Sequence, residues 1–140
     1  MFAGKGGVGV KRMPSPHVEV MPKWCVECHA AKFEDEKEQV VEEGGHTFKA
    51  SLNFCLKCHG DLYMRVPKLK LQVEKLLKQV EQMLESSKDK ESKAYKDAKL
   101  NYDLVKGDGG CGFHNFEYAK ALLEYSLSLR KELSGEQLEK

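Results

Sequence analysis

Several features that place a chain in a broad class of proteins are missing from these 140 residues. No apolar run approaches the length of a membrane-spanning helix. Neither sign of charge dominates, because 23 Lys and Arg residues stand against 22 Asp and Glu residues. A basic field that would attract nucleic acid is therefore absent. We expect a protein with no membrane span and no nucleic-acid partner.

The start of the sequence also lacks a nucleotide-binding loop, although glycine is frequent there. Residues 4–9 read Gly-Lys-Gly-Gly-Val-Gly, but a phosphate-binding loop needs Gly-Lys-Ser/Thr between a strand and a helix. Pro14 and Pro16 follow closely and disfavour a helix. We predict a flexible glycine loop whose backbone lies close to a flat group.

One five-residue pattern occurs twice. Residues 25–29 read Cys-Val-Glu-Cys-His, and residues 55–59 read Cys-Leu-Lys-Cys-His. C-x-x-C-H is typical of c-type haem attachment, in which two thiols bond one porphyrin and the adjoining histidine ligates its iron. We predict two covalently attached haem c groups. Their attachment residues are Cys25, Cys28, Cys55 and Cys58, and their proximal iron ligands are His29 and His59.

Two other interpretations of the cysteines are weaker. Four thiolates could bind a structural zinc ion, but that leaves the histidine after each pair unexplained. Disulfides within each pair are disfavoured, because a two-residue gap is poor disulfide geometry outside redox motifs. Cys111 is the odd cysteine, and its glycine neighbours indicate a loop position.

Histidine is sparse, and this scarcity limits the distal iron ligands. After His29 and His59, three of the five histidines remain for two distal positions: His17, His46 and His114. His17 precedes the first motif by about the same interval as His46 precedes the second, which indicates a weak internal repeat. We predict bis-histidine iron at both sites, with the distal assignments open on this reasoning.

The apolar spacing predicts an all-α fold. We predict a haem-organised segment over 1–62 with little regular structure, then helices over 63–140 that pack on it as one compact domain. Helical periodicity marks three long helices near 69–84, 95–105 and 115–133. Pro67 is expected in the first turn of the first and Ser86 as N-cap of the second. A short charged helix is expected over 30–43.

The last of these helices carries a resemblance. Residues 112–123 read Gly-Phe-His-Asn-Phe-Glu-Tyr-Ala-Lys-Ala-Leu-Leu. This resembles the G-x-H-N-x-x-Y-A-x-x-L-L stretch of multihaem cytochromes of the cytochrome c nitrite reductase and hydroxylamine oxidoreductase superfamily. The order of two haem motifs followed by long helices is similar to the C-terminal part of those enzymes. The resemblance covers most of the chain.

The resemblance implies particular ligand pairs. His114 would be the distal ligand opposite His29, and His17 would be the distal ligand opposite His59. His46 matches a ligand of an earlier haem that has no motif here. It is then uncommitted, replaces another ligand, or serves a neighbouring chain.

The differences between this chain and the multihaem enzymes that it resembles argue against catalysis. This chain has no third motif and no C-x-x-C-K, so nothing favours nitrite or hydroxylamine chemistry. We therefore expect an electron carrier rather than an enzyme, with redox proteins as partners. The alternative is a module or subunit of a larger multihaem assembly or homo-oligomer. A protein with one five-coordinate haem is a further alternative.

The cellular location follows from the attachment chemistry. Covalent haem attachment normally takes place outside the cytoplasm, so we expect a periplasmic or extracytoplasmic protein. The first residues contain no apolar stretch typical of a signal peptide. The expectation is therefore a mature form or an excised part of a longer protein.

Overall fold

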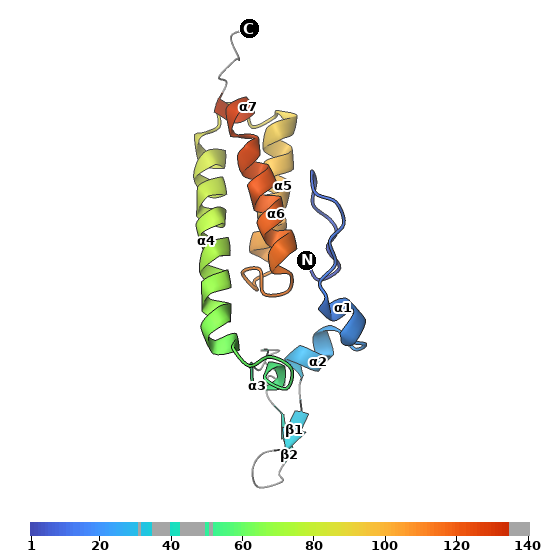
Figure 1. Ribbon diagram of the computed structural model, residues 1–140. Helices are drawn as coiled ribbons and strands as arrows, with labels where there is room; N and C mark the ends of the chain where they lie inside the picture. The colour runs from blue at the N-terminus through green and yellow to red at the C-terminus, as the bar shows by residue number, and fades with distance from the viewer. Residues whose placement is uncertain (31, 35–39, 43–49, 51, 135–140) are drawn as a thin grey trace. The chain divides into compact units, whose positions relative to one another are not determined.

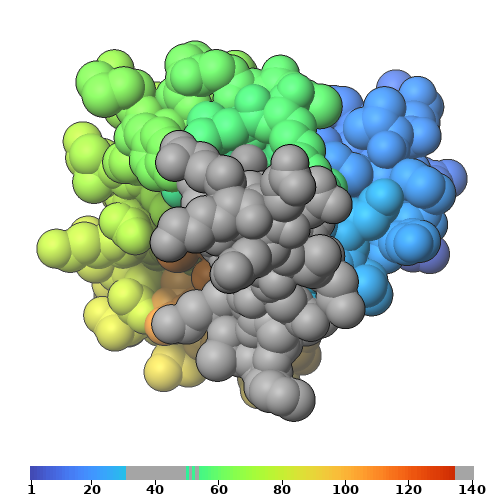
Figure 2. All heavy atoms as spheres, turned by 90° about the horizontal axis from the view of Figure 1, so that it is seen from below, coloured from blue at the N-terminus to red at the C-terminus, as the bar shows by residue number. Residues whose placement is uncertain are grey.

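The computed structural model describes residues 1–30, 32–34, 40–42, 50 and 52–134, which are coloured along the chain in Figure 1 and Figure 2. Two compact units emerge. Met1–Ser15 and Lys68–Lys140 form one, called here the helical unit. Pro16–Pro67 forms the other, called here the cysteine-rich unit. The predicted fold class is confirmed, since a helical bundle follows an irregular N-terminal part. The predicted division into 1–62 and 63–140 stays a prediction.

Three long helices run up, down and up: α4 (Leu62–Ser86), α5 (Lys93–Gly107) and α6 (Phe116–Ser128) (Figure 1). The helical unit contains α5, α6 and the part of α4 from Lys68 onward. A short helix, α7 (Arg130–Ser134), follows α6. Each long helix buries one apolar stripe, as its spacing predicts. Their buried side chains form a single core of Val73, Val80, Met83, Leu84, Ala94, Ala98, Tyr102, Val105, Tyr118, Ala119, Leu122, Leu123, Leu129 and Leu133.

The helix ends differ from the predictions. Pro67 lies inside α4, because this helix begins earlier, at Leu62. The N-cap of α5 is Ser92, whose hydroxyl accepts a hydrogen bond from the Tyr95 N–H at 3.2 Å. Ser86 instead ends α4 and donates to the Met83 carbonyl. The prediction of Ser86 as cap was wrong, because several local Ser and Asp residues offer equivalent caps.

The predicted third helix starts where expected but is interrupted. The Asn115 side chain caps α6 by accepting from the Tyr118 N–H at 3.2 Å. The helix ends at Ser128, and the chain turns at Leu129 before α7 begins. Leu129 and Leu133 are both in the core. The periodicity therefore predicted the buried positions correctly and missed the break between the helices.

Residues 1–15 form a loop that doubles back on itself beside α5 and α6, called here the N-terminal strap (Figure 1). The fully buried Asn101 side chain bonds the backbone of Val8 twice, accepting its N–H at 2.9 Å and donating to its carbonyl at 3.1 Å. A Cβ at Gly9 would lie 2.1 Å from the Tyr125 ring. The glycine loop does lie against a flat group, and that group is a tyrosine ring.

The cysteine-rich unit is built from short elements. These are α1 (His17–Val20), α2 (Cys25–His29), strands β1 (Lys32–Glu34) and β2 (Val40–Glu42), and α3 (Leu52–Cys55). The strands pair antiparallel, with Phe33 opposite Val41. The helix predicted over 30–43 was wrong, because β-branched Val40 and Val41 favour extended backbone despite the charged residues between the strands.

Candidate functional site

Both C-x-x-C-H motifs fold as a single helical turn. The first forms α2, and the Ala30 N–H closes it on the Val26 carbonyl at 2.9 Å. In the second, the N–H groups of Cys58 and His59 both donate to the Cys55 carbonyl, at 3.1 and 3.0 Å. Side chains three residues apart lie on one face of a helical turn. Each motif therefore presents its two sulfur atoms to the same side.

All five cysteines lie in the described part of the chain and are thiols, so none is in a disulfide. Cys25 and Cys58 are exposed, whereas Cys28 and Cys55 are half-buried. Burial raises the pKa of the Cys28 thiol, and the neighbouring Cys55 and Glu27 raise it further. Burial likewise raises the pKa of Cys55, partly offset by a backbone hydrogen bond. Both groups are therefore protonated thiols at neutral pH.

The influence of Cys55 on Cys28 also shows that the two motifs lie near each other within the cysteine-rich unit. They are separated in sequence by the paired strands, whose antiparallel hairpin returns the chain toward its starting point. The sequence predicted two attachment motifs, and the fold of this unit brings them together.

Two of the predicted iron ligands are adjacent. The imidazole centroids of His17 and His59 lie 5.7 Å apart, with their planes inclined by 61°. His17 begins α1, and His59 follows the turn of the second motif. His29 ends α2 and is half-buried. His46 lies outside the described residues, so its predicted role stays a prediction.

His114 lies in the helical unit, in the loop between α5 and α6. Its Nδ1 is 2.8 Å from an Asp108 carboxylate oxygen. The Asp108 side chain is 13% exposed and the imidazole 32%, so the pair is largely shielded from water. The predicted pairing of His114 with His29 involves the other unit and stays a prediction. Sequence reasoning missed Asp108, because it contacts His114 through the fold of a loop, where no helical or strand periodicity applies.

Apolar side chains are exposed next to both motifs. Trp24 is 44% exposed, Val26 53% and Leu56 37%. Trp24 also has a φ of 50°, which is rare for a residue with a side chain and is found most often at functional sites. By contrast, Leu62 and Val66 are the only buried apolar side chains among the described residues of this unit. The motif cysteines are therefore flanked by apolar side chains that are exposed to solvent.

Haem and zinc place different geometric demands on the four motif cysteines. A structural zinc site needs four ligands converging on one point. Within the described ranges, which include all four motif cysteines, no three His, Cys, Asp or Glu side chains form such a group. Haem attachment needs no convergence of the two pairs, because each pair bonds its own porphyrin. Two same-sided thiols followed by histidine, beside exposed apolar side chains, fit a covalently bound haem at each motif.

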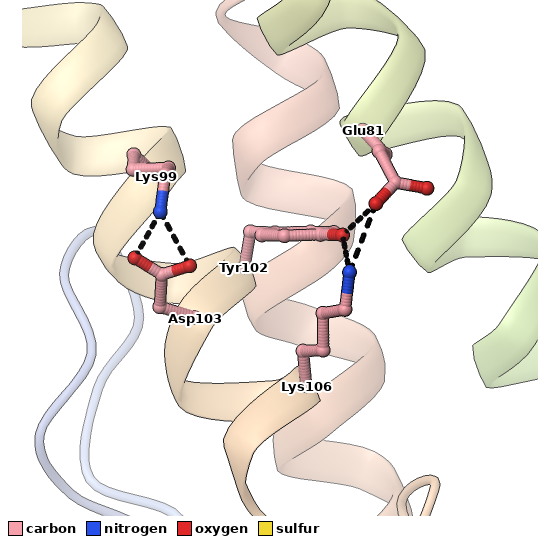
Figure 3. A network of polar contacts seen from close by, with 5 residues as sticks. All are labelled: Glu81, Lys99, Tyr102, Asp103 and Lys106. Atoms are coloured by element: carbon pink, nitrogen blue, oxygen red, sulfur yellow. Dashed lines mark hydrogen bonds and ion pairs between the residues drawn. The ribbon is translucent and has the colours of Figure 1, made fainter.

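A second polar cluster, in the helical unit, was also missed by sequence reasoning. The Tyr102 hydroxyl donates to the Glu81 carboxylate, and Lys106 donates to both of them, at 2.6 Å to Tyr102 and 2.9 Å to Glu81 (Figure 3). The bonds from Tyr102 and then Lys106 lower the pKa of Glu81. Burial, followed by the bond to Glu81, raises the pKa of Tyr102. This arrangement joins α4 to α5 and holds a protonated tyrosine.

No family model, curated protein or solved structure matches this chain. Among the helices that the structure describes, none combines the length and apolar character needed to cross a bilayer.

Proposed function

We propose that this chain is a di-haem c-type cytochrome that transfers single electrons between redox proteins outside the cytoplasm. The observation that carries the proposal is the repeated C-x-x-C-H motif, which folds at both places as the same helical turn. The similarity of residues 112–123 to the multihaem cytochromes supports it. Bound haem supplies an iron that changes by one electron between its ferric and ferrous forms.

The cysteines perform the attachment. In each motif the two thiols would add to the two vinyl groups of one porphyrin, each forming one C–S bond while its S–H hydrogen moves to the other vinyl carbon. Cys25 and Cys28 would hold one group, and Cys55 and Cys58 the other. Four free cysteines, with no disulfide among them, supply the thiols that this addition consumes. The adjoining His29 and His59 then lie next to their own porphyrin attachments.

The small number of buried apolar side chains among the described residues of the cysteine-rich unit also favours the proposal. A unit this small seldom stabilises itself without a disulfide, a metal or another added group. It has no disulfide, and its apolar side chains Trp24, Val26 and Leu56 are exposed beside the motifs. Burying apolar surface contributes roughly 25 cal/mol per Å². Two porphyrins covering these side chains would supply the core that the polypeptide lacks.

The position of His17 supports bis-histidine ligation of the second iron. Two imidazoles on opposite sides of one metal ion, each with a bond of about 2 Å, have ring centroids about 6 Å apart. The centroids of His17 and His59 are separated by 5.7 Å. His17 and His59 would then both hold this iron and would leave no coordination position open to substrate or oxygen. This favours an electron carrier over an enzyme.

The test is expression of the chain together with a haem c maturation system. We expect a red protein whose mass exceeds that of the polypeptide by two haem groups, and whose absorption bands survive denaturation. The double variant Cys25→Ala/Cys28→Ala should carry one haem, as should Cys55→Ala/Cys58→Ala. Cys111→Ala is the matched control, because this thiol belongs to no motif, and it should carry two.

A colourless product with the mass of the bare polypeptide would contradict the proposal. Retention of two haems by a double variant would contradict the assignment of that motif. Sedimentation of the purified protein at several concentrations would separate a free carrier from a subunit of a larger assembly. Reduced protein should show almost no spectral change with carbon monoxide, whereas a five-coordinate haem would change strongly.

A further inference from the structure

We propose that Asp108 is a positioning residue for an iron ligand: it fixes the tautomer and direction of the His114 imidazole and strengthens it as a donor. This inference rests on the proposed function for its final step. The hydrogen-bonded pair itself is independent of haem.

The contact between the two side chains determines which ring nitrogen can bind a metal. His114 Nδ1 lies 2.8 Å from the Asp108 carboxylate. An ionised carboxylate has no hydrogen to donate, so Nδ1 must carry the proton of this bond. In the neutral ring the lone pair then lies on Nε2. Histidines that ligate metals almost always donate their other N–H to such a group. Asp108 therefore prepares His114 for ligation through Nε2.

The loop around the pair is built to hold it. A Cβ at Gly110 would lie 3.1 Å from both the Asp108 carboxylate and His114 Nδ1, so the backbone lies against both groups. The Phe113 N–H donates to the Gly110 carbonyl at 2.9 Å. Cys111, at a φ of 47°, is one of two described non-glycine residues with positive φ. Such strain persists only where the surrounding structure imposes it.

The loop is anchored to the core at both ends. Asp108 directly follows α5, and Asn115 caps α6 immediately after His114. A Cβ at Gly112 would lie 2.7 Å from a methyl group of the fully buried Val73, so the loop backbone packs on α4. The imidazole is thus held by elements of one unit. The direction of the imidazole is set before any metal binds. Less conformational entropy is therefore lost when the ring ligates the metal.

The carboxylate also affects the iron. A hydrogen bond from Nδ1–H to a carboxylate increases the electron density of the imidazole and makes it a stronger donor. A stronger anionic donor set favours the ferric iron over the ferrous iron. Removing the charge of Asp108 should therefore make the iron ligated by His114 easier to reduce, and leave the other iron unchanged.

The first measurement concerns the tautomer and needs no haem. Nitrogen-15 spectra of the histidine-labelled full chain, produced without the maturation system, should show His114 protonated on Nδ1. Asp108→Asn keeps an oxygen acceptor and should retain this tautomer, whereas Asp108→Ala should shift it toward Nε2–H. Asp103→Ala is the matched control, because Asp103 pairs with Lys99 on the exposed side of α5. A wild-type His114 protonated on Nε2 would overturn the proposal.

The second measurement uses the haem-loaded chain. At a fixed applied potential, Asp108→Asn should raise the ferrous-to-ferric ratio of one haem about tenfold, in line with the effect of metal-site supporting residues. Asp108→Glu should restore much of the wild-type ratio, and Asp103→Asn should not change it. Circular dichroism would confirm that each variant retains its helices.

The outcomes separate this inference from the proposed function. If no haem attaches, the proposed function fails, while the tautomer measurement still decides whether Asp108 positions His114. If two haems attach and His114→Ala leaves both irons low-spin, His114 is not a ligand, and the inference is overturned while the proposed function stands. Equal ferrous-to-ferric ratios in Asp108→Asn and in the wild type would also overturn the inference.

Discussion

The helical unit and the cysteine-rich unit acquire stability in different ways. The helical unit buries fourteen side chains in one core. In the cysteine-rich unit the described residues include two buried apolar side chains, and several large ones are exposed. Long amphipathic helices can cover one another, whereas one-turn helices and three-residue strands present too little apolar surface to do so. The comparison shows one unit whose long helices share a core and another whose described apolar side chains are mostly exposed, where the proposed haem groups would bind.

The largest effect is expected from removing the attachment residues. In a variant with Ala at Cys25, Cys28, Cys55 and Cys58, the cysteine-rich unit should open with a free energy near zero, while α5 and α6 keep the protection of the folded state. Hydrogen exchange followed by mass spectrometry would measure both units in one sample. Equal protection of the cysteine-rich unit with and without haem would break the comparison.

The next effect concerns the iron ligands of the cysteine-rich unit. His17→Ala should convert one of the two haems to high spin, with loss of about half of the low-spin signal in paramagnetic resonance of the oxidised protein. His46→Ala is the matched control and should retain both low-spin signals. High spin in His46→Ala alone would show that His46 takes the place assigned here to His17 or His114.

The helical unit should respond to a core substitution without changing its haem content. Leu122 is fully buried, and Leu122→Ala should lower the free energy of unfolding by about 2–5 kcal/mol. Leu100 is 46% exposed on α5, and Leu100→Ala should change the free energy of unfolding by less than about 0.5 kcal/mol. Denaturant titration monitored by circular dichroism measures both. A loss of bound haem in Leu122→Ala would show that the units are not independent.

A further prediction concerns how the N-terminal strap is anchored to the helical unit. Asn101→Ala removes both hydrogen bonds to Val8 and leaves its partly buried backbone N–H and C=O groups without this partner. The expected cost is about 1–3 kcal/mol, with faster proteolysis of residues 1–15. Lys99→Ala, which removes only a surface pair on the same helix, should leave both properties unchanged. A strap with unchanged protease resistance in Asn101→Ala would contradict its anchoring role.

The smallest effect is expected from the network in which the buried Tyr102 meets the exposed Glu81 and Lys106. The pKa of Glu81 is lowered in the folded chain, chiefly by the Tyr102 hydrogen bond. Its contribution to stability is therefore present above the ordinary value of 4.5 and is lost as the pH falls below it. Glu81→Gln should flatten this acid dependence slightly. Glu85→Gln is the control. An equal change in the acid dependence of stability in that variant would contradict the assignment of this dependence to Glu81.

The sequence predicted the core of the helical unit well. The stripe of Val73, Val80 and Leu84 is buried as its spacing requires, and Asn115 caps α6 at the predicted position. The cap of α5 could not be chosen, because Ser86 and Ser92 both precede helical sequence. The strands were missed because their short segments lie among charged residues that are common in helices.

The attachment motifs are a property of the sequence alone, since C-x-x-C-H requires only residue type and spacing, and a single helical turn then places both sulfur atoms on one side. Which histidines meet is a property of the tertiary structure. His17 reaches His59 across a long stretch of chain, and Asp108 reaches His114 only because a strained loop folds back between two helices. Local periodicity carries no information about such contacts, because they depend on how separate elements pack.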